Sequence, residues 1–163
     1  MTNAPRRRKG GYFPTNPGDP APLIVRLTER IHFSDVDAMG ILWHGRFANL
    51  FEKANEALGS LCGMTYADFY RDRLRAPVVQ LHVDYFAPVP LADEVKIVGR
   101  MIWNEGARMD IEYEIHTKDG KLAATGYTVQ MFVDEKGVPL LAPPAMQEQC
   151  RRRWLAGELG EAK

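Results

Sequence analysis

The 163-residue sequence contains few cysteines and no long apolar segment. Its two cysteines, Cys62 and Cys150, have no ligand-like spacing and cannot supply the disulfide framework of a small secreted protein. No apolar run approaches the roughly 18 residues that suggest a membrane-spanning helix. The basic N-terminus is not followed by the apolar stretch of a secretory signal. These absences predict a reduced, soluble, cytoplasmic protein.

An excess of charge is absent as well. The 21 Lys and Arg residues balance 21 Asp and Glu residues, so no overall field attracts nucleic acid or an anionic membrane. Basic residues cluster in 6–9 and 151–153, near the two ends, and we interpret these clusters as solvated tails. The sequence has no glycine-rich phosphate loop, and its histidines have no metal-ligand spacing. We therefore expect no nucleic-acid or membrane partner and no metal.

Proline and hydrophobic periodicity divide the chain into three parts. Residues 1–22 are rich in proline and polar residues and predict a flexible leader, because this composition cannot bury a core. Residues 23–140 contain the regular patterns of a folded domain, and residues 141–163 form a C-terminal tail that is helical over about 146–155. Strand-like patterns occupy 23–33, 78–87, 94–103, 109–117 and 122–134.

One long helix dominates the domain. Its apolar stripe, at intervals of three and four residues, consists of Phe47, Leu50, Phe51, Ala54, Leu58 and Leu61. Gly63 follows the stripe and is suited to end the helix. A short second helix is predicted after Thr65, with Asp68 completing a capping box. One apolar helix among several strands indicates an α+β fold, in which an antiparallel sheet curves around the helix.

Two segments carry a resemblance to a known family. "FSDVDAMGILWHGRFANLFEKA", followed by "APVVQLHVDYFAPVPLADEV", is similar to the hotdog-fold acyl-CoA thioesterases, and most to the 4-hydroxybenzoyl-CoA thioesterase-like branch. The first motif runs from Asp37 through Gly40 and His44 to Phe47. The second runs from Pro77 to Pro88. The resemblance implies a hotdog fold and hydrolysis of a thioester to a free acid and CoA-SH, with coenzyme A as part of the substrate and no separate cofactor.

The resemblance also implies the catalytic residues. Asp37 would be the carboxylate that acts as general base or nucleophile, and the alternative is that it only caps the turn ahead of Gly40. A backbone N–H at the start of the long helix, near His44, would bind the oxyanion, since helix N-termini present unpaired donors and a partial positive charge. Gly45 would let a substrate carbonyl approach the backbone. The His44 imidazole could assist the reaction or be a polar residue satisfied at the helix start.

Asp35 lies two residues before Asp37, and two close carboxylates sometimes form an acid–base pair. We favour the alternative that Asp35 bonds to the backbone or pairs with a cation such as Arg46. Arg46 itself stands where many relatives carry Asn.

Substrate-binding candidates follow by position. Arg73 and Arg75, just before Pro77, could hold coenzyme A, although ordinary solvated charge is the simpler interpretation of both. Four aromatic residues could line an acyl tunnel, although aromatic residues at helical spacing usually belong to a core: Trp43, Phe47, Phe51 and Tyr66. Unpaired edge strands and the family resemblance imply a homodimer or homotetramer.

Two alternative functions stay open. The same residues could release acyl or polyketide chains from a carrier protein, or the fold could bind acyl-CoA without catalysis. A hydratase is a weaker hypothesis than either, because the sequence lacks the Asp-x-Asn-Pro-x-His arrangement of those relatives. The acyl group itself is not determined by the sequence.

Overall fold

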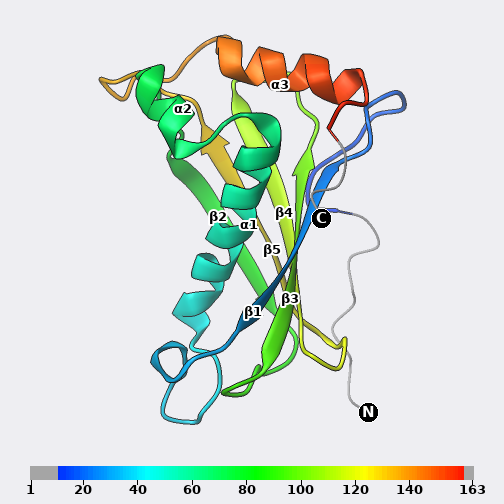
Figure 1. Cartoon of the computed structure of the whole chain (residues 1–163), viewed down its shortest axis with the longest axis vertical. Helices are drawn as coiled ribbons and strands as arrows, with labels where there is room; N and C mark the ends of the chain where they lie inside the picture. The colour runs from blue at the N-terminus through cyan, green and yellow to red at the C-terminus, as the bar shows by residue number, and fades with distance from the viewer. Residues whose placement is uncertain (1–10, 160–163) are drawn as a thin grey trace.

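The computed structural model describes residues 11–159. In chain order its elements are β1 (Leu23–Arg30), η1 (Phe33–Asp35), η2 (His44–Arg46), α1 (Phe47–Cys62), α2 (Tyr66–Arg71), β2 (Val78–Tyr85), β3 (Glu94–Ile102), β4 (Arg108–His116), β5 (Leu122–Met131) and α3 (Ala145–Leu155). The strands form one antiparallel sheet in the order β1-β3-β4-β5-β2. The sheet curves around α1 (Figure 1). The predicted elements are confirmed, although several strands end earlier than expected.

Helix α1 supplies one half of the core. Its buried side chains are Phe47, Leu50, Phe51, Ala54, Leu58 and Cys62, which are the predicted stripe with Cys62 in place of Leu61. The helix packs mainly against β3 and β1, and the Phe51 ring stacks on Tyr113 of β4 with centroids 4.3 Å apart. Gly63 ends the helix in the left-handed conformation, at φ 73°, as predicted.

Alternation along β4 decides which side chains meet the helix. Met109, Ile111, Tyr113 and Ile115 are all buried, as the period of two predicts. On the opposite face, the His116 imidazole and the Glu114 carboxylate form a hydrogen bond. Asp110 departs from the expected solvent exposure, because it is buried beside Arg108. The Asp119-Gly120 hairpin that joins β4 to β5 is confirmed by a bond from the Gly120 N–H to the Thr117 carbonyl.

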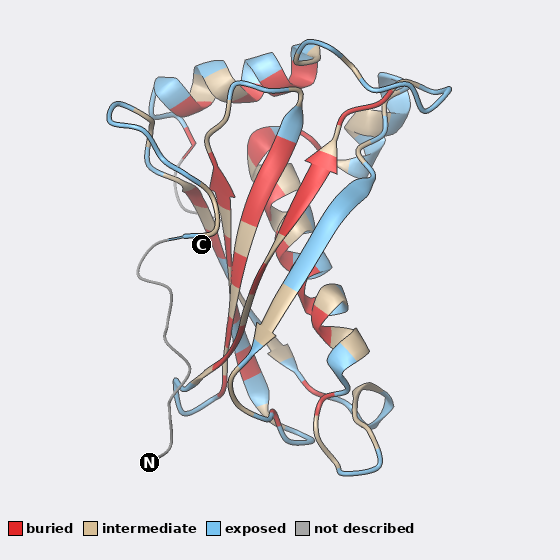
Figure 2. Ribbon diagram, turned by 180° about the vertical axis from the view of Figure 1, so that it is seen from behind, coloured by how far each residue is buried: buried red, intermediate tan, exposed pale blue. Residues whose placement is uncertain are grey.

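The helix covers only part of the sheet. Because α1 lies over β1 and β3, it leaves the β5 and β2 side less covered. Strand β2 is bonded to β5 along one edge and stands at the end of the sheet. Figure 2 shows this strand exposed over most of its length, whereas its bonded neighbour β5 is largely buried. Short helix α2 sits above this side of the sheet, and its predicted capping box, Thr65 with Asp68, is confirmed.

The segments outside the predicted domain also touch the sheet. Residues 11–22, the described part of the predicted leader, form no helix or strand. Tyr12 nevertheless bonds to Asp84 and Thr125 on the face of the sheet opposite α1. Helix α3 lies across one end of the sheet (Figure 1) and adds Met146, Cys150 and Trp154 to the same core. The basic cluster at 6–9 lies outside the described residues.

None of the helices within residues 11–159 combines the length and the apolar character needed to cross a membrane.

Candidate active site

The loop between β1 and α1 folds back on itself and fixes Asp37. Its backbone closes through bonds from the Asp37 N–H to the Ile41 carbonyl, 2.9 Å, and from the Gly40 N–H to the Asp37 carbonyl, 3.0 Å. A third bond in this loop involves the Asp37 side chain, whose Oδ1 accepts from the Met39 N–H at 2.8 Å. Within residues 11–159 the second oxygen, Oδ2, forms no hydrogen bond. Asp37 therefore holds the turn with one oxygen and leaves the other available to a substrate or water.

Asp35 has a structural role in the same loop. Its Oδ2 accepts a bond from the His32 N–H at 2.9 Å, and its Oδ1 lies 3.8 Å from Nε of Arg46. Both interactions were expected under the structural interpretation of Asp35, and that interpretation is confirmed. Arg46 is thereby tied to the loop, where its Nη2 also donates to the Ser34 carbonyl.

The chain enters α1 through the single turn of η2. Trp43 precedes η2 and Arg46 precedes α1, and among the described residues no side chain caps either start. The first N–H groups of a helix have no partner inside it, and the aligned peptide dipoles give this end about half a positive charge. On the opposite side of the turn, the Tyr85 hydroxyl donates to the His44 carbonyl at 3.2 Å. This helix N-terminus is therefore an electropositive set of donors, tied to the end of β2.

Gly45 makes room for an aromatic ring. A methyl group at this position would lie 2.6 Å from Cη2 of Trp43, so the indole occupies the space that any larger residue would fill. The Trp43 ring also meets the His44 imidazole at 5.1 Å between centroids, and Trp43 is about half exposed. We expected Gly45 to leave its backbone open to a substrate carbonyl. The Trp43 ring instead occupies part of the space beside Gly45.

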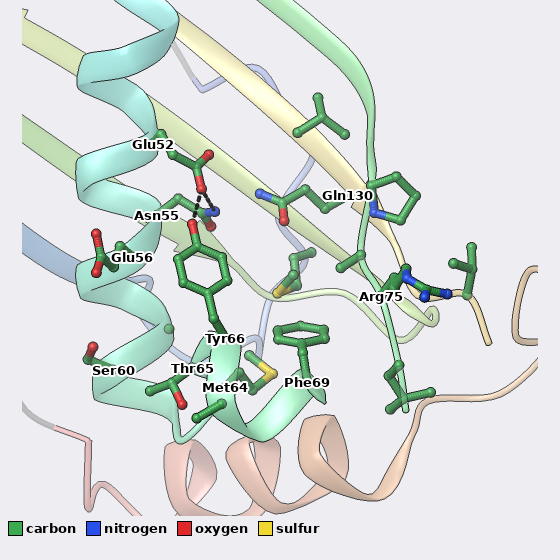
Figure 3. Close-up of a pocket in the computed structure, with 18 of the residues that line it drawn as sticks. Glu52, Asn55, Glu56, Ser60, Met64, Thr65, Tyr66, Phe69, Arg75 and Gln130 are labelled. Carbon is green, nitrogen blue, oxygen red and sulfur yellow. Dashed lines mark hydrogen bonds between the residues drawn. The ribbon is translucent and has the colours of Figure 1, made fainter. Parts of the chain in front are cut away.

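A cavity of about 700 Å³ lies farther along α1, where the helix leaves the sheet uncovered (Figure 3). It is bounded by α1 from Glu52 onward, by α2, and by the ends of β2, β3, β4 and β5. Apolar residues form much of the wall: Met64, Phe69, Pro77, Val78, Met101 and Met109. Because α1 rises 1.5 Å per residue, the cavity begins roughly 8 Å along the helix from Phe47.

Polar side chains from α1 and α2 meet at the side of this cavity. The Tyr66 hydroxyl donates to Glu52 Oε1, and the Asn55 amide donates to the same oxygen at 3.3 Å. The hydrogen bond to the Glu52 carboxylate, with burial, raises the pKa of Tyr66 to about 12. Tyr66 therefore stays protonated at neutral pH and acts as a donor to Glu52.

The predicted substrate-binding residues are not gathered in one place. Arg75 and Pro77 line the large cavity. Arg73 is exposed and lines a separate depression of about 460 Å³ with Arg75, beyond α2. Phe47 is buried in the core against Tyr85.

Sequence reasoning did not find the polar group inside the cavity. Gln130, Glu52 and Tyr66 all line it. Tyr66 was a candidate for the tunnel wall and Glu52 lies within the first segment that resembles the family, but neither was assigned a polar role, and Gln130 lies in no motif. The alternation of β5 could have placed Gln130 on the helix-facing side, although no local pattern reveals that α1 leaves this part uncovered. In the described part of the chain, no three His, Cys, Asp or Glu side chains gather in a group that could hold a metal ion.

Comparison with known proteins agrees with the fold. The chain is 24% identical over 109 residues to a 1,4-dihydroxy-2-naphthoyl-CoA hydrolase of Crocosphaera subtropica, which covers 65% of this chain and 80% of that protein. The structure of the present chain is similar to that of a DHNA-CoA thioesterase from Staphylococcus aureus, with a TM-score of 0.74 and 24% identity. The match covers 86% of this chain and 99% of that one. The present structure is also similar to a Staphylococcus aureus protein solved in complex with CoA, with a TM-score of 0.72, 13% identity, and coverage of 86% and 89%.

These likenesses confirm the expected hotdog fold. Relatives named as hydrolases and thioesterases of CoA esters support an enzyme of the acyl-CoA thioesterase class. Residues 31–150, most of the chain, match the family described as the thioesterase-like superfamily. The chain belongs to the thioesterase-like superfamily.

Proposed function

We propose that this protein hydrolyses acyl-CoA thioesters, with Asp37 as the catalytic carboxylate. The observation that carries the proposal is the pairing of two features at one end of α1. A loop holds the Asp37 carboxylate by one oxygen only, and the adjacent helix N-terminus has no side-chain cap among the described residues. A thioester needs such a pair, because its hydrolysis requires an activated nucleophile and a site for negative charge on the carbonyl oxygen.

In the general-base route, Asp37 takes a proton from a water molecule as the water oxygen attacks the thioester carbon. The carbonyl electrons move onto oxygen, and the tetrahedral intermediate then collapses with loss of the CoA thiolate, which takes up a proton. In the nucleophilic route, Asp37 attacks the carbon itself, releases CoA and forms an anhydride that water hydrolyses. Both routes place the same carboxylate beside the same carbonyl. The products in each case are a free acid and CoA-SH.

The oxyanion would be held by backbone N–H groups at the start of η2, near His44 and Gly45. Such donors act where charge develops in the transition state, and one of them is worth about 10²- to 10³-fold in rate. The partial positive charge of the helix end favours the same oxygen. The neighbouring His44 imidazole and Trp43 indole would border the thioester.

The acyl group would extend along α1 into the 700 Å³ cavity, past Arg75 and Pro77. Coenzyme A would extend from the other side of the thioester, outside the cavity. Arg73 and Arg75 lie at the cavity end of α1, so they would be candidate partners for its phosphates from the second copy of a dimer. Support for a CoA ester comes from the relatives named as 1,4-dihydroxy-2-naphthoyl-CoA hydrolases and from the structural relative in complex with CoA. The reaction needs no cofactor beyond the substrate's own coenzyme A, and we expect it to take place in the cytoplasm.

The edge of the sheet supports a homodimer. Strand β2 has a bonded neighbour, β5, on one side, and its exposed side chains include Val78, Val79, Leu81 and Tyr85, each about half accessible. An exposed apolar edge strand is normally covered by another chain. We propose that two copies pair through β2, which would place a second chain beside the open cavity. Light scattering after size exclusion tests this pairing, and a monomer at micromolar concentration would contradict it.

The proposed function is tested by free-thiol release from short, medium, long and aromatic acyl-CoA esters. Asp37→Asn keeps the oxygen that accepts from the Met39 N–H, so the loop should keep its shape while general-base catalysis is lost. We expect kcat to fall by about 10²- to 10⁴-fold. Asp35→Asn is the matched control, two residues away in the same loop, and should stay within a few fold of the wild type. The proposal would be falsified if Asp37→Asn hydrolysed every active ester as fast as the wild type.

Two other functions are outcomes of the same assay. Faster hydrolysis of acyl groups on a carrier protein than on CoA would assign the enzyme to carrier-bound chains. Tight binding of acyl-CoA without hydrolysis of any ester would assign the protein to a non-catalytic binding role.

A further inference from the structure

Strand β5 presents a change of residue type along its helix-facing side. Gly126 lies against the Phe51 ring, and the Thr128 hydroxyl bonds to the Tyr113 hydroxyl at 2.9 Å beneath the same helix. Gln130 is the next residue on that side, because strand side chains alternate. It lies where α1 no longer covers the sheet, and it lines the cavity. A long amide therefore replaces the small residues at the point where the cavity opens.

The Gln130 amide is buried and incompletely bonded. Gln130 is only 5% exposed, and its Nε2 is buried and has no hydrogen-bond partner among the described residues. Figure 3 shows the amide nitrogen pointing across the cavity toward Asn55 and Glu52 on α1. A buried donor without a partner costs about 1–3 kcal/mol. A ligand atom that accepts this hydrogen bond would remove that cost on binding.

The surroundings select the kind of acceptor. Met109 pairs with Gln130 across β4 and β5, and Met101 lines the same cavity. Both side chains are apolar and offer little to a strongly hydrated group. Glu52 carries negative charge on the opposite wall, where Tyr66 and Asn55 already donate to it. A carboxylate in the acyl group would therefore meet an apolar wall and a like charge. A neutral oxygen, such as a hydroxyl, meets neither obstacle.

The position of Gln130 also sets where this oxygen must be. Ala124 on β5 pairs with Tyr85, and Tyr85 bonds to His44 at the start of the helix. Gln130 lies six residues farther along β5, which is roughly 20 Å at the rise of a strand. An acyl group whose carbonyl sits at the helix N-terminus can meet Gln130 only with a distant part of its chain.

We propose that Gln130 is a specificity residue, which selects acyl groups that carry a neutral oxygen far from the thioester. This inference rests on the proposed function, since it assumes that the acyl group enters the cavity from the thioester end. The substrate class is an extended, mostly apolar acyl-CoA with a remote hydroxyl. The Gln130 amide donates to that oxygen and acts on substrate preference, while the bond-breaking step stays with Asp37.

The test compares three CoA esters of equal chain length: hexadecanoyl-CoA, ω-hydroxyhexadecanoyl-CoA and β-hydroxyhexadecanoyl-CoA. We expect the wild type to prefer the ω-hydroxy ester over hexadecanoyl-CoA by about ten-fold in kcat/KM, the effect of one hydrogen bond. The β-hydroxy ester, whose oxygen lies near the thioester, should gain no such preference. Gln130→Leu and the similarly shaped Gln130→Met should reduce the ω-hydroxy preference to near one.

Gln147→Leu is the matched control. Gln147 is also a buried glutamine, but it belongs to α3 and its amide donates to the Gly106 and Arg108 carbonyls. It lies outside the large cavity, so the ω-hydroxy preference should survive its replacement. Thermal unfolding of each variant establishes that the comparison is made on folded protein.

The outcomes separate this inference from the proposed function. Hydrolysis of all three esters without an ω-hydroxy preference in the wild type would overturn the role of Gln130 and leave the thioesterase intact. A preference that survives both Gln130 variants would likewise overturn it. If the wild type hydrolyses no CoA ester at all, the proposed function fails first and the inference fails with it. The inference is supported if both Gln130 variants lose the ω-hydroxy preference but still hydrolyse the esters, while the wild type and Gln147→Leu keep the preference.

Discussion

Gly126 is the position at which one added carbon should disturb the sheet most. A methyl group there would lie within 3.0 Å of the His82 carbonyl oxygen on β2 and 2.7 and 2.8 Å from two carbons of the Phe51 ring. Ordinary contacts of this kind begin near 3.4 Å, so the ring would have to move by about 0.7 Å to clear its nearer carbon. The His82 carbonyl belongs to the backbone of a paired strand, and it can move only if β2 separates from β5.

We expect Gly126→Ala to destabilise the protein by about 3–5 kcal/mol. Overpacking of a core costs about 1–3 kcal/mol, and each weakened bond of the β2–β5 ladder adds about 1 kcal/mol. This is a large part of the 5–15 kcal/mol that stabilises a typical domain. Urea unfolding, followed by circular dichroism, measures the difference.

Gly106→Ala is the control for the same chemical change, because a methyl group there meets nothing closer than 3.5 Å. Replacing the Phe51 ring by a smaller side chain, in Gly126→Ala/Phe51→Leu, should restore only part of the lost stability, since the backbone contact with His82 remains. Equal stability of Gly126→Ala and Gly106→Ala would refute the reasoning. Full recovery in the double variant would refute the part assigned to the backbone.

Three further predictions concern single contacts. Tyr12→Phe removes the hydroxyl that bonds to Asp84 and Thr125, and we expect a loss of about 1–2 kcal/mol in urea unfolding with kcat unchanged. Burial raises the pKa of Asp110 despite the nearby Arg108; a raised acid pKa stabilises the fold at low pH, and this contribution is lost as pH rises through the folded value. Asp110→Asn should therefore raise the melting temperature at pH 7 by about 2–4 °C, and the gain should vanish below the ordinary Asp range; a gain that grows on acidification would contradict the sign. Gly45→Ala should displace the Trp43 ring and lower kcat by up to about 10²-fold, and activity that is unaffected, or not partly recovered in Gly45→Ala/Trp43→Leu, would contradict the role of that contact.

Local signals in the sequence predicted most of the elements. The spacing of apolar residues predicted α1, and Thr65 with Asp68 predicted the start of α2, because a capping box depends on residues three positions apart. Asp119-Gly120 predicted a hairpin for the same kind of reason. The loop contacts of Asp35 were also predictable, since its partners lie within about a dozen residues along the chain.

Features that depend on distant segments were not predictable in the same way. The cavity exists because α1 crosses β1 and β3 and leaves the β5 and β2 side less covered, and no local pattern specifies that placement. Gln130 was missed for this reason, although alternation could have assigned its face. The contact of the Trp43 ring with Gly45 depends on a rotamer at the start of the helix. The roles of Asp37, His44 and the two arginines stay predictions for the assays above.

The contact between α3 and the segment before β1 has a consequence for synthesis on the ribosome. The Trp154 indole donates to the Ala21 carbonyl at 2.8 Å, and the Met146 and Cys150 side chains belong to the same core as Leu23. Within residues 11–159 the first strand, β1, is bonded to β3 and lies at an edge of the sheet. A growing chain can therefore assemble the middle of the sheet but cannot seal this end of the core until α3 has been translated. Until then its unsealed apolar surface is open to chaperones, and a message truncated before α3 would yield a product for proteases rather than a smaller enzyme.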